Sequence, residues 1–177
     1  MKIAVIGAGV MGLATAWALR RRGYEPVVYE QFALGHDRGS SHGRSRIFRL
    51  DGERPIPSVV SFKPGRHTHE MYSLHDSEYG LKVGAHHAGP EADPNVPGEP
   101  EPALIERIAA WAAATYRLDD ATPVGAETCM YTTTADETFI LERRGRIVIG
   151  SPCSGHGFKF APAIGERLAA LAVAAAG

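Results

Sequence analysis

Three glycines near the start of the chain could bring backbone N–H groups against a phosphate. Gly7, Gly9 and Gly12 follow the spacing Gly-x-Gly-x-x-Gly, between a run of apolar residues and a segment with helical periodicity. In this context the first glycine permits a tight turn, the second lets the backbone approach a pyrophosphate, and the third lets a helix pack closely on a strand. The first helical N–H groups, those of Val10 and Met11, would then point at the phosphates together with the positive end of the helix dipole.

An acidic residue follows at the distance that dinucleotide recognition needs. Glu30 ends the next apolar run, 18 residues after Gly12. A carboxylate there can accept both hydroxyls of an adenosine ribose, which favours an unphosphorylated ribose. The pattern predicts a dinucleotide-binding β-α-β unit with parallel strands over the first 30 residues. It does not separate FAD from NAD, and a glycine-rich turn without a ligand is the alternative.

Four further segments carry polar or glycine residues that could surround a cofactor and an amino-acid substrate. They are residues 39–49 (GSSHGRSRIFR), 82–86 (KVGAH), 129–132 (CMYT) and 154–160 (SGHGFKF). In this order, and together with the glycine motif, they make the chain resemble the monomeric sarcosine oxidase and N-methyl-L-tryptophan oxidase family, flavoenzymes of the D-amino-acid-oxidase type. The resemblance covers residues 1–50 and about 70–174.

The resemblance implies FAD as the cofactor and a small secondary amino acid, such as sarcosine or another N-methyl amino acid, as the substrate. The C–N bond would be oxidised to an imine, which water hydrolyses, and O2 would be reduced to hydrogen peroxide. No strong general base stands out in the sequence, which fits a substrate amine that reacts as the free base.

Several residues acquire a role only through the resemblance. Lys82 would stand where oxygen is activated, since a fixed positive charge stabilises the superoxide-like charge that forms there. His86 would shape the substrate pocket, and Arg46 would lie near the flavin. Without the resemblance, a solvated lysine and an exposed histidine are the simpler interpretation of Lys82 and His86.

Four residues are implied to bind the substrate. Arg49 and Lys159 would hold its carboxylate, the first as a bidentate fork and the second as a point charge. Tyr72 and Tyr131 would line the pocket. A cluster of surface charge is the alternative explanation for Arg49 and its neighbour Arg46.

Other residues are implied to contact FAD. They are Ser40, His42, Arg46, Gly155, His156, Gly157 and Lys159. A glycine loop before the last helix can let backbone reach the pyrimidine edge of the flavin, where the helix end favours negative charge. As a bare pattern, the same loop is also typical of a flexible turn into a helix.

Cys129 is implied to attach covalently to the 8α-methyl group of the flavin ring. This chemistry needs a thiolate that attacks an electron-poor ring, and a positive environment favours the thiolate. The alternative is a buried, inert cysteine, which is the commoner fate of a free thiol. Cys153 matches no motif and is expected to be structural.

Three other classes of site fit the sequence less well than a flavin site. The histidines at 67, 69, 75, 86 and 87 could suggest a metal cluster, but no cysteine or acidic partner falls at a ligand spacing, so no metal site is expected. No nucleophile elbow indicates a hydrolase. An NAD-dependent dehydrogenase would leave Cys129 and the Gly-His-Gly-Phe-Lys run unexplained.

Short regular elements must position these residues. Apolar runs predict strands at 2–6, 25–29, 58–62 and 79–83 and a hairpin of 139–141 with 147–149; helical spacing predicts helices at 13–22, at 104–118 and from Pro162 onward. In the family that the chain resembles, much more chain separates the segment like 46–49 from the segment like 72–82. A large internal deletion is therefore expected.

The predicted fold class is α/β: a reduced Rossmann-like FAD-binding domain with a small antiparallel β remnant of the substrate domain. Residues 1–50 and 103–177 would form the FAD-binding domain, and 51–102 the remnant and a connector. Missing strands predict exposed edges or apolar surface, hence low stability or association with another copy. A second hypothesis is therefore a non-catalytic FAD- or nucleotide-binding remnant.

Charge and cysteine content narrow the partners. Lys and Arg total 19 against 20 Asp and Glu, for a net charge of −1, which gives no support to a nucleic-acid or anionic-membrane surface. Two cysteines are too few for a disulfide framework and suit a cytoplasmic setting. No signal-peptide pattern is present. The expected partners are a small amine and O2, and the expected state is a monomer or a weak homo-oligomer.

Overall fold

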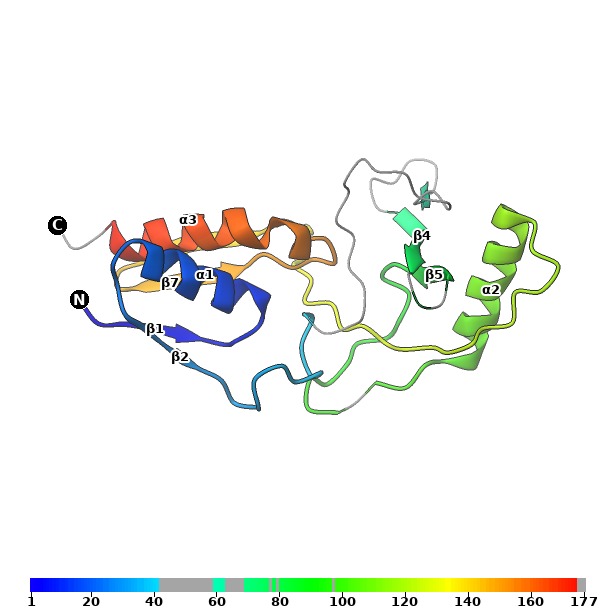
Figure 1. The fold of residues 1–177 in the computed structure, drawn as a ribbon, viewed down its shortest axis with the longest axis horizontal. Helices are drawn as coiled ribbons and strands as arrows, with labels where there is room; N and C mark the ends of the chain where they lie inside the picture. The colour runs from blue at the N-terminus through cyan, green and yellow to red at the C-terminus, as the bar shows by residue number, and fades with distance from the viewer. Residues whose placement is uncertain (42–58, 63–68, 77, 79, 97, 175–177) are drawn as a thin grey trace. The chain divides into compact units, whose positions relative to one another are not determined.

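The chain divides into two compact units. The computed structural model describes residues 1–41, 59–62, 69–76, 78, 80–96 and 98–174 (Figure 1). Residues 1–46 and 130–177 belong to unit 1, and residues 47–129 belong to unit 2. No helix in these described stretches has the length and apolar character needed to cross a membrane.

Unit 1 begins with the predicted β-α-β unit. Strand β1 (Ile3–Ile6) is followed by helix α1 (Val10–Arg21) and strand β2 (Pro26–Tyr29). The two strands pair in parallel, with Ile3 opposite Pro26, as the sequence predicts. Helix α1 starts three residues earlier than predicted because Gly9 is already its N-cap. After the helix the chain turns at Gly23, whose φ of 82° favours glycine.

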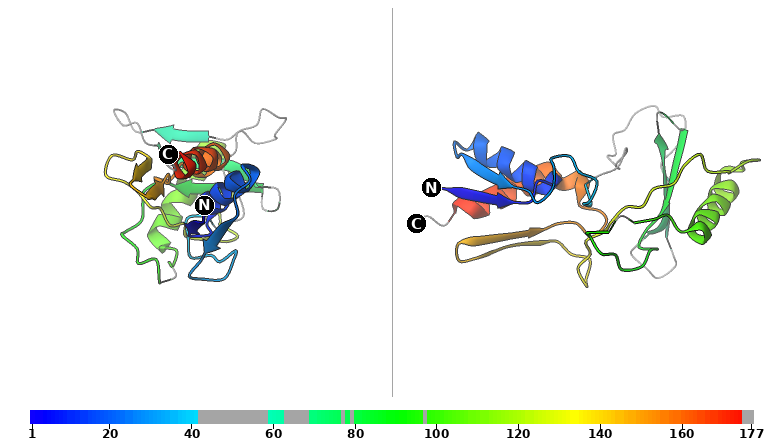
Figure 2. Two further views of the ribbon diagram at one scale, coloured as in Figure 1. Left: turned by 90° about the vertical axis from the view of Figure 1, so that its left-hand side faces the viewer. Right: turned by 90° about the horizontal axis from the view of Figure 1, so that it is seen from below.

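The C-terminal half of unit 1 is a hairpin followed by a helix. Strands β6 (Ile140–Arg144) and β7 (Ile147–Ser151) are antiparallel, and the 3₁₀ turn η1 (Phe158–Phe160) leads into helix α3 (Ala161–Val173). Both the hairpin and the last helix were predicted. Figures 1 and 2 show α1 and α3 side by side, with the hairpin against α3. At their crossing a Cβ on Gly165 would lie 2.6 Å from the backbone of Ala14, so only glycine permits this approach.

The core of unit 1 covers one face of the two-stranded sheet. Ala18, Leu19 and Ala169 are fully buried, and side chains from β1, including Ile3 and Val5, pack against them. Residues that alternate with these point to the other face and are exposed: Ala4, Ile6, Val27 and Tyr29. The side chain of Ile6 is 80% exposed, whereas parallel sheets are normally covered on both faces. Exposed apolar surface, which the sequence predicts, is therefore present on this face of the sheet.

The described part of unit 2 contains an antiparallel sheet and a helix. Its strands β3 (Val59–Phe62), β4 (His69–Asp76) and β5 (Gly80–Ala85) lie in that order, and helix α2 (Pro102–Tyr116) contacts β5. Strands β3 and β5 were predicted, and β4 was not. The hydroxyls of Ser73 and Tyr116 meet between β4 and α2. Helix α2 thus groups with the antiparallel sheet in unit 2.

Candidate functional site

The glycine loop of unit 1 has the geometry that its spacing predicts. Gly7 has a φ of 96°, which side-chain-bearing residues rarely adopt, and its N–H donates to the Tyr29 carbonyl oxygen at 2.8 Å. A Cβ on Gly12 would overlap the carbonyl oxygen of Gly7. Gly12 therefore lets α1 pack directly on the loop that leaves β1.

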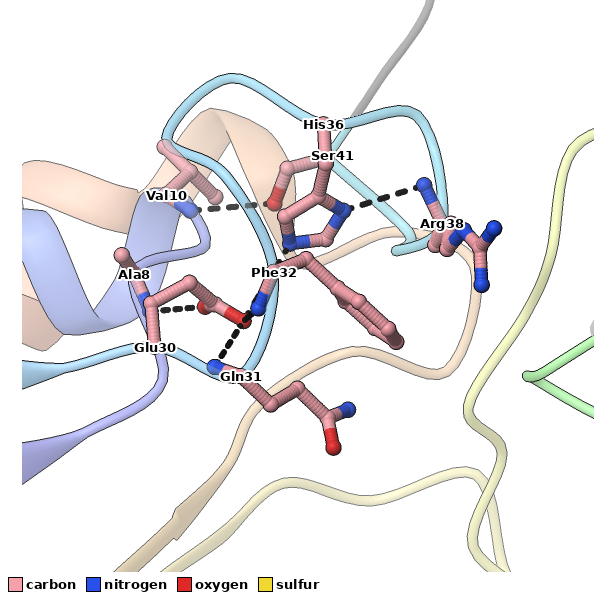
Figure 3. Close-up of polar contacts among 8 residues, drawn as sticks. All are labelled: Ala8, Val10, Glu30, Gln31, Phe32, His36, Arg38 and Ser41. Atoms are coloured by element: carbon pink, nitrogen blue, oxygen red, sulfur yellow. Dashed lines mark hydrogen bonds and ion pairs between the residues drawn. The ribbon is translucent and has the colours of Figure 1, made fainter.

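The N-terminus of helix α1 is held by a hydroxyl from a distant loop. Gly9 provides no side-chain cap, and the N–H of Val10 donates to Ser41 Oγ at 3.0 Å (Figure 3). A Cβ on Gly9 would lie 3.2 Å from the same oxygen. The N–H of Val10 at this helix start therefore already holds an oxygen atom, which is the kind of acceptor that a phosphate supplies. Ser41 belongs to the motif at residues 39–49, but it is not among the residues predicted to contact FAD.

Glu30 closes the glycine loop through its carboxylate. Oε2 accepts the N–H of Ala8 at 2.7 Å, while Oε1 accepts those of Gln31 at 2.8 Å and Phe32 at 3.1 Å (Figure 3). These backbone N–H groups, Ala8 first, lower the pKa of Glu30 from its ordinary value, and His36 adds to the effect. The Glu30 carboxylate of the folded chain is therefore anionic at neutral pH.

The lowered pKa makes Glu30 a source of acid sensitivity. Because its folded pKa lies below the ordinary 4.5, its contribution to stability is present above about pH 4.5 and is lost as pH falls through the folded pKa. We expect Glu30→Gln to lower the free energy of unfolding at pH 7 and to flatten its fall in acid, measured by urea denaturation from pH 7 to 3. The exposed Glu91→Gln serves as control, and equal acid limbs for Glu30→Gln and wild type would contradict this role.

A histidine outside the predicted site residues lies beside this carboxylate. His36 Nε2 lies 3.5 Å from Glu30 Oε1, and its Nδ1 accepts the N–H of Arg38 at 3.0 Å (Figure 3). The ring also contacts Phe32 edge-on, and the Arg38 guanidinium lies over the Phe32 ring, 4.9 Å from its centroid. Residues 30–41 thus form a loop held by its own polar and aromatic contacts.

Three of the predicted site segments meet in unit 1. Ser40 Oγ lies 3.4 Å from Thr132 Oγ1, and the carbonyl oxygen of Thr132 accepts the N–H of Ser154 at 2.8 Å. Ser154 is 1% exposed and has a φ of 43°, and its hydroxyl also accepts the N–H of Thr134 at 3.3 Å. Backbone and hydroxyl contacts therefore join the segments 39–49, 129–132 and 154–160, through Ser40, Thr132 and Ser154.

The glycine loop before α3 is closely packed at Gly157. A Cβ on Gly157 would overlap the carbonyl oxygen of Pro152, while Gly155 has a φ of 71°. His156 stacks on Phe139 with ring centroids 4.8 Å apart. Lys159 is exposed, and its ammonium lies 5.3 Å from the Phe160 ring centroid. At the start of the loop, burial raises the pKa of the Cys153 thiol.

Unit 2 gathers three predicted residues on one face of its sheet. Tyr72 pairs with Gly84, and the neighbouring pairs place Lys82 and His86 on the same side of the strands, because side chains alternate. Ser73, which contacts α2, lies on the opposite side. A Cβ on Gly84 would lie 2.5 Å from the Tyr72 ring, so glycine at this position lets the tyrosine cross the strand.

An unpredicted carboxylate binds Lys82. Lys82 Nζ lies 2.6 Å from Glu127 Oε1. The Lys82 side chain is 24% exposed and the Glu127 side chain is 47% exposed. Glu127 stands two residues before the exposed Cys129. Its position two residues before the motif cysteine is the one sequence signal that could have identified Glu127 as a site residue.

Three predicted site residues, His42, Arg46 and Arg49, lie outside the described residues, as does the histidine at position 67. Among the residues that are described, no three His, Cys, Asp or Glu side chains are grouped so that they could hold a metal ion.

Comparison with known proteins gives one family. The family model described as "DAO: FAD dependent oxidoreductase" matches residues 2–89 and 51–171. The chain is 32% identical to "Probable sarcosine oxidase" of Arabidopsis thaliana, over 74% of this chain and 32% of that protein. It is 38% identical to "Peroxisomal sarcosine oxidase" of Homo sapiens, over 59% and 29% respectively, and 33% identical to "Monomeric sarcosine oxidase" of Arthrobacter sp., over 53% and 26%.

No solved structure is significantly similar to the chain. Its matched part spans about a third or less of the length of these curated relatives. The family match nevertheless extends over nearly all of the chain, and includes both the glycine loop of unit 1 and the sheet of unit 2. The chain therefore belongs to the DAO family of FAD-dependent oxidoreductases.

Proposed function

We propose that the chain binds FAD through unit 1 and oxidises the C–N bond of a secondary amino acid such as sarcosine. The observation that supports FAD binding most is the glycine loop, where Gly12 packs on Gly7 and the carboxylate of Glu30 faces the N–H of Ala8. This arrangement fits the adenosine diphosphate half of FAD, since the helix start binds phosphate and the carboxylate binds ribose. A carboxylate has about four acceptor positions, so Glu30 can accept a ribose hydroxyl beside its three backbone N–H groups.

The remaining FAD contacts in this proposal come from the other segments. They are Gly9, Val10, Met11, Ser40, His42, Gly155, His156, Gly157 and Lys159. The close packing of Gly157 on Pro152 supports this assignment, because a packed backbone can present N–H groups without reorganising. Cys129 is proposed to bind the flavin ring covalently through its exposed thiol.

The substrate chemistry rests on unit 2 and on basic side chains. When bound, FAD supplies the acceptor for two electrons from the C–N bond and passes them to O2, which gives hydrogen peroxide. Lys82 supplies positive charge on the same sheet face as Tyr72 and His86, which would bound the pocket. Arg49 and Lys159 would hold the substrate carboxylate, with Arg46 near the flavin and Tyr131 lining the pocket.

One observation favours a second candidate, a nucleotide-binding remnant without catalysis. The face of the β1–β2 sheet that bears Ile6 and Tyr29 is exposed, whereas an intact nucleotide domain would cover it. Loss of the wall that excludes water weakens both orientation and desolvation of the substrate, and these supply a large part of catalysis.

Reconstitution with FAD separates these functions. The purified chain is expected to take up FAD, seen as a flavin absorbance spectrum after desalting, and to release peroxide when sarcosine is added. Peroxide formation should saturate with sarcosine and stop when O2 is removed. Bound FAD without sarcosine-dependent peroxide would favour the remnant, and a colourless chain that refuses added FAD would contradict both candidates.

A further inference from the structure

An ion pair ties the segment that precedes Cys129 to the sheet of unit 2. Lys82 Nζ on β5 and Glu127 Oε1 lie 2.6 Å apart, a short charge-assisted contact. The side chains of Lys82 and Glu127 are 24% and 47% exposed, so the pair lies at the surface and solvent screens it in part. Residues 117–129 form no helix or strand, and this pair therefore gives the segment a fixed point that secondary structure does not provide.

A second contact fixes the residue between Glu127 and Cys129. Thr128 Oγ1 donates to the carbonyl oxygen of Gly98 at 3.2 Å. A Cβ on Gly98 would lie 2.7 Å from the same hydroxyl oxygen, so the two segments approach as closely as a glycine allows. The chain is thus held by side chains at two consecutive positions, and the next residue carries the exposed thiol.

We propose that Glu127 is a positioning residue for Cys129: its ion pair with Lys82 holds the thiol beside the sheet face that carries Lys82 and Tyr72. Two residues span at most about 7 Å, so fixing Glu127 confines the Cα of Cys129 to a small region near that face. This inference rests on the proposed function, because it assigns to Glu127 the placement of the thiol for covalent attachment of FAD.

The attachment step shows why placement matters. A bond forms between Cys129 Sγ and the 8α-methyl carbon of the ring, and the thiol proton and one methyl hydrogen are lost. The two electrons released pass through the ring to O2, which leaves as hydrogen peroxide. The thiol must reach one carbon atom at bonding distance, and a side chain held in place reaches it far more often than one on a free segment.

Attachment kinetics test the proposal in the full chain. Glu127→Gln keeps the size of the side chain and removes its charge, and it is expected to slow covalent attachment of saturating FAD about tenfold, which is the effect of about 1.4 kcal/mol. The measured quantity is the flavin that stays with the acid-precipitated protein over time. The exposed Glu91→Gln is the matched control. The exchange Lys82→Glu with Glu127→Lys should restore attachment without restoring peroxide formation, because the charge at position 82 is then negative.

Amide hydrogen exchange tests the same inference without FAD. In the flavin-free chain, Glu127→Gln is expected to raise the exchange rate of peptides that contain Thr128, Cys129 and Met130, and the charge exchange should lower it again. If wild type binds FAD but attaches none, the proposed covalent bond fails, and if it binds no FAD, the proposed function fails; in both cases this measurement still decides the inference. Exchange and attachment rates equal to those of wild type in Glu127→Gln would overturn the positioning role.

Discussion

Replacing Cys129 with serine is expected to move all covalently held flavin from the protein pellet to the supernatant after acid precipitation. A serine hydroxyl has neither the acidity nor the nucleophilicity of a thiol, so the thioether cannot form. The side chain is exposed, and the exchange of sulfur for oxygen removes no core packing. The urea denaturation midpoint of the variant should therefore stay close to that of wild type.

Cys153 provides the matched control for this experiment. It is half-buried, and burial raises the pKa of its thiol, which keeps it in the unreactive protonated form. Cys153→Ser should leave the flavin in the pellet while it lowers stability, since a polar group replaces a buried sulfur. Flavin that stays with the pellet in Cys129→Ser, or leaves it in Cys153→Ser, would contradict the assignment of the attachment site.

The part of the fold that local sequence determines was predicted well. The glycine motif at residues 7–12 marks the start of α1, and Gly23 marks its end. The apolar runs before and after the helix form β1 and β2, which pair in parallel as predicted. Helix α2 starts two residues before the prediction because Pro102 suits the first helical turn. It ends at Tyr116, because the next residue, Arg117, has a left-handed φ of 54°.

The elements that depend on distant partners were harder to predict. Strand β4 (HEMYSLHD) mixes polar and apolar residues without a clear period, and its pairing with both β3 and β5 stabilises it. The chain's division into units likewise reflects packing of α2 on β5, which no local pattern indicates.

The candidate site also divides into features that local sequence determines and contacts between distant residues. The special backbone conformations at Gly7 and Gly155 and the close packing of Gly12 and Gly157 are local requirements, and the motifs contained them. The contacts of Ser41 with Val10 and of Glu127 with Lys82 join residues 31 and 45 positions apart, and single-sequence patterns carry no information on such pairs. His36 was missed for another reason: its contact with Glu30 depends on the path of the loop between them.

The largest effect on FAD binding is expected from Gly12→Ala. Its Cβ would overlap the Gly7 carbonyl oxygen and lie 3.5 Å from Val5, so α1 must move away from the loop that leaves β1. That movement displaces the N–H groups at the helix start, which form the phosphate site. We expect the dissociation constant for FAD, measured by quenching of flavin fluorescence, to rise at least about 100-fold, equivalent to about 2.8 kcal/mol.

Gly165→Ala separates this local effect from a general loss of stability. Its Cβ would also clash with backbone, at Ala14, but on the side of α1 that packs against α3. Both variants should unfold at lower urea, because each forces two packed elements apart. Only Gly12→Ala should lose FAD affinity while the chain is still folded, since only its clash lies within the phosphate loop. An equal loss of affinity in the two variants would mean that FAD binding depends on the overall stability of unit 1 and not on the geometry of this loop.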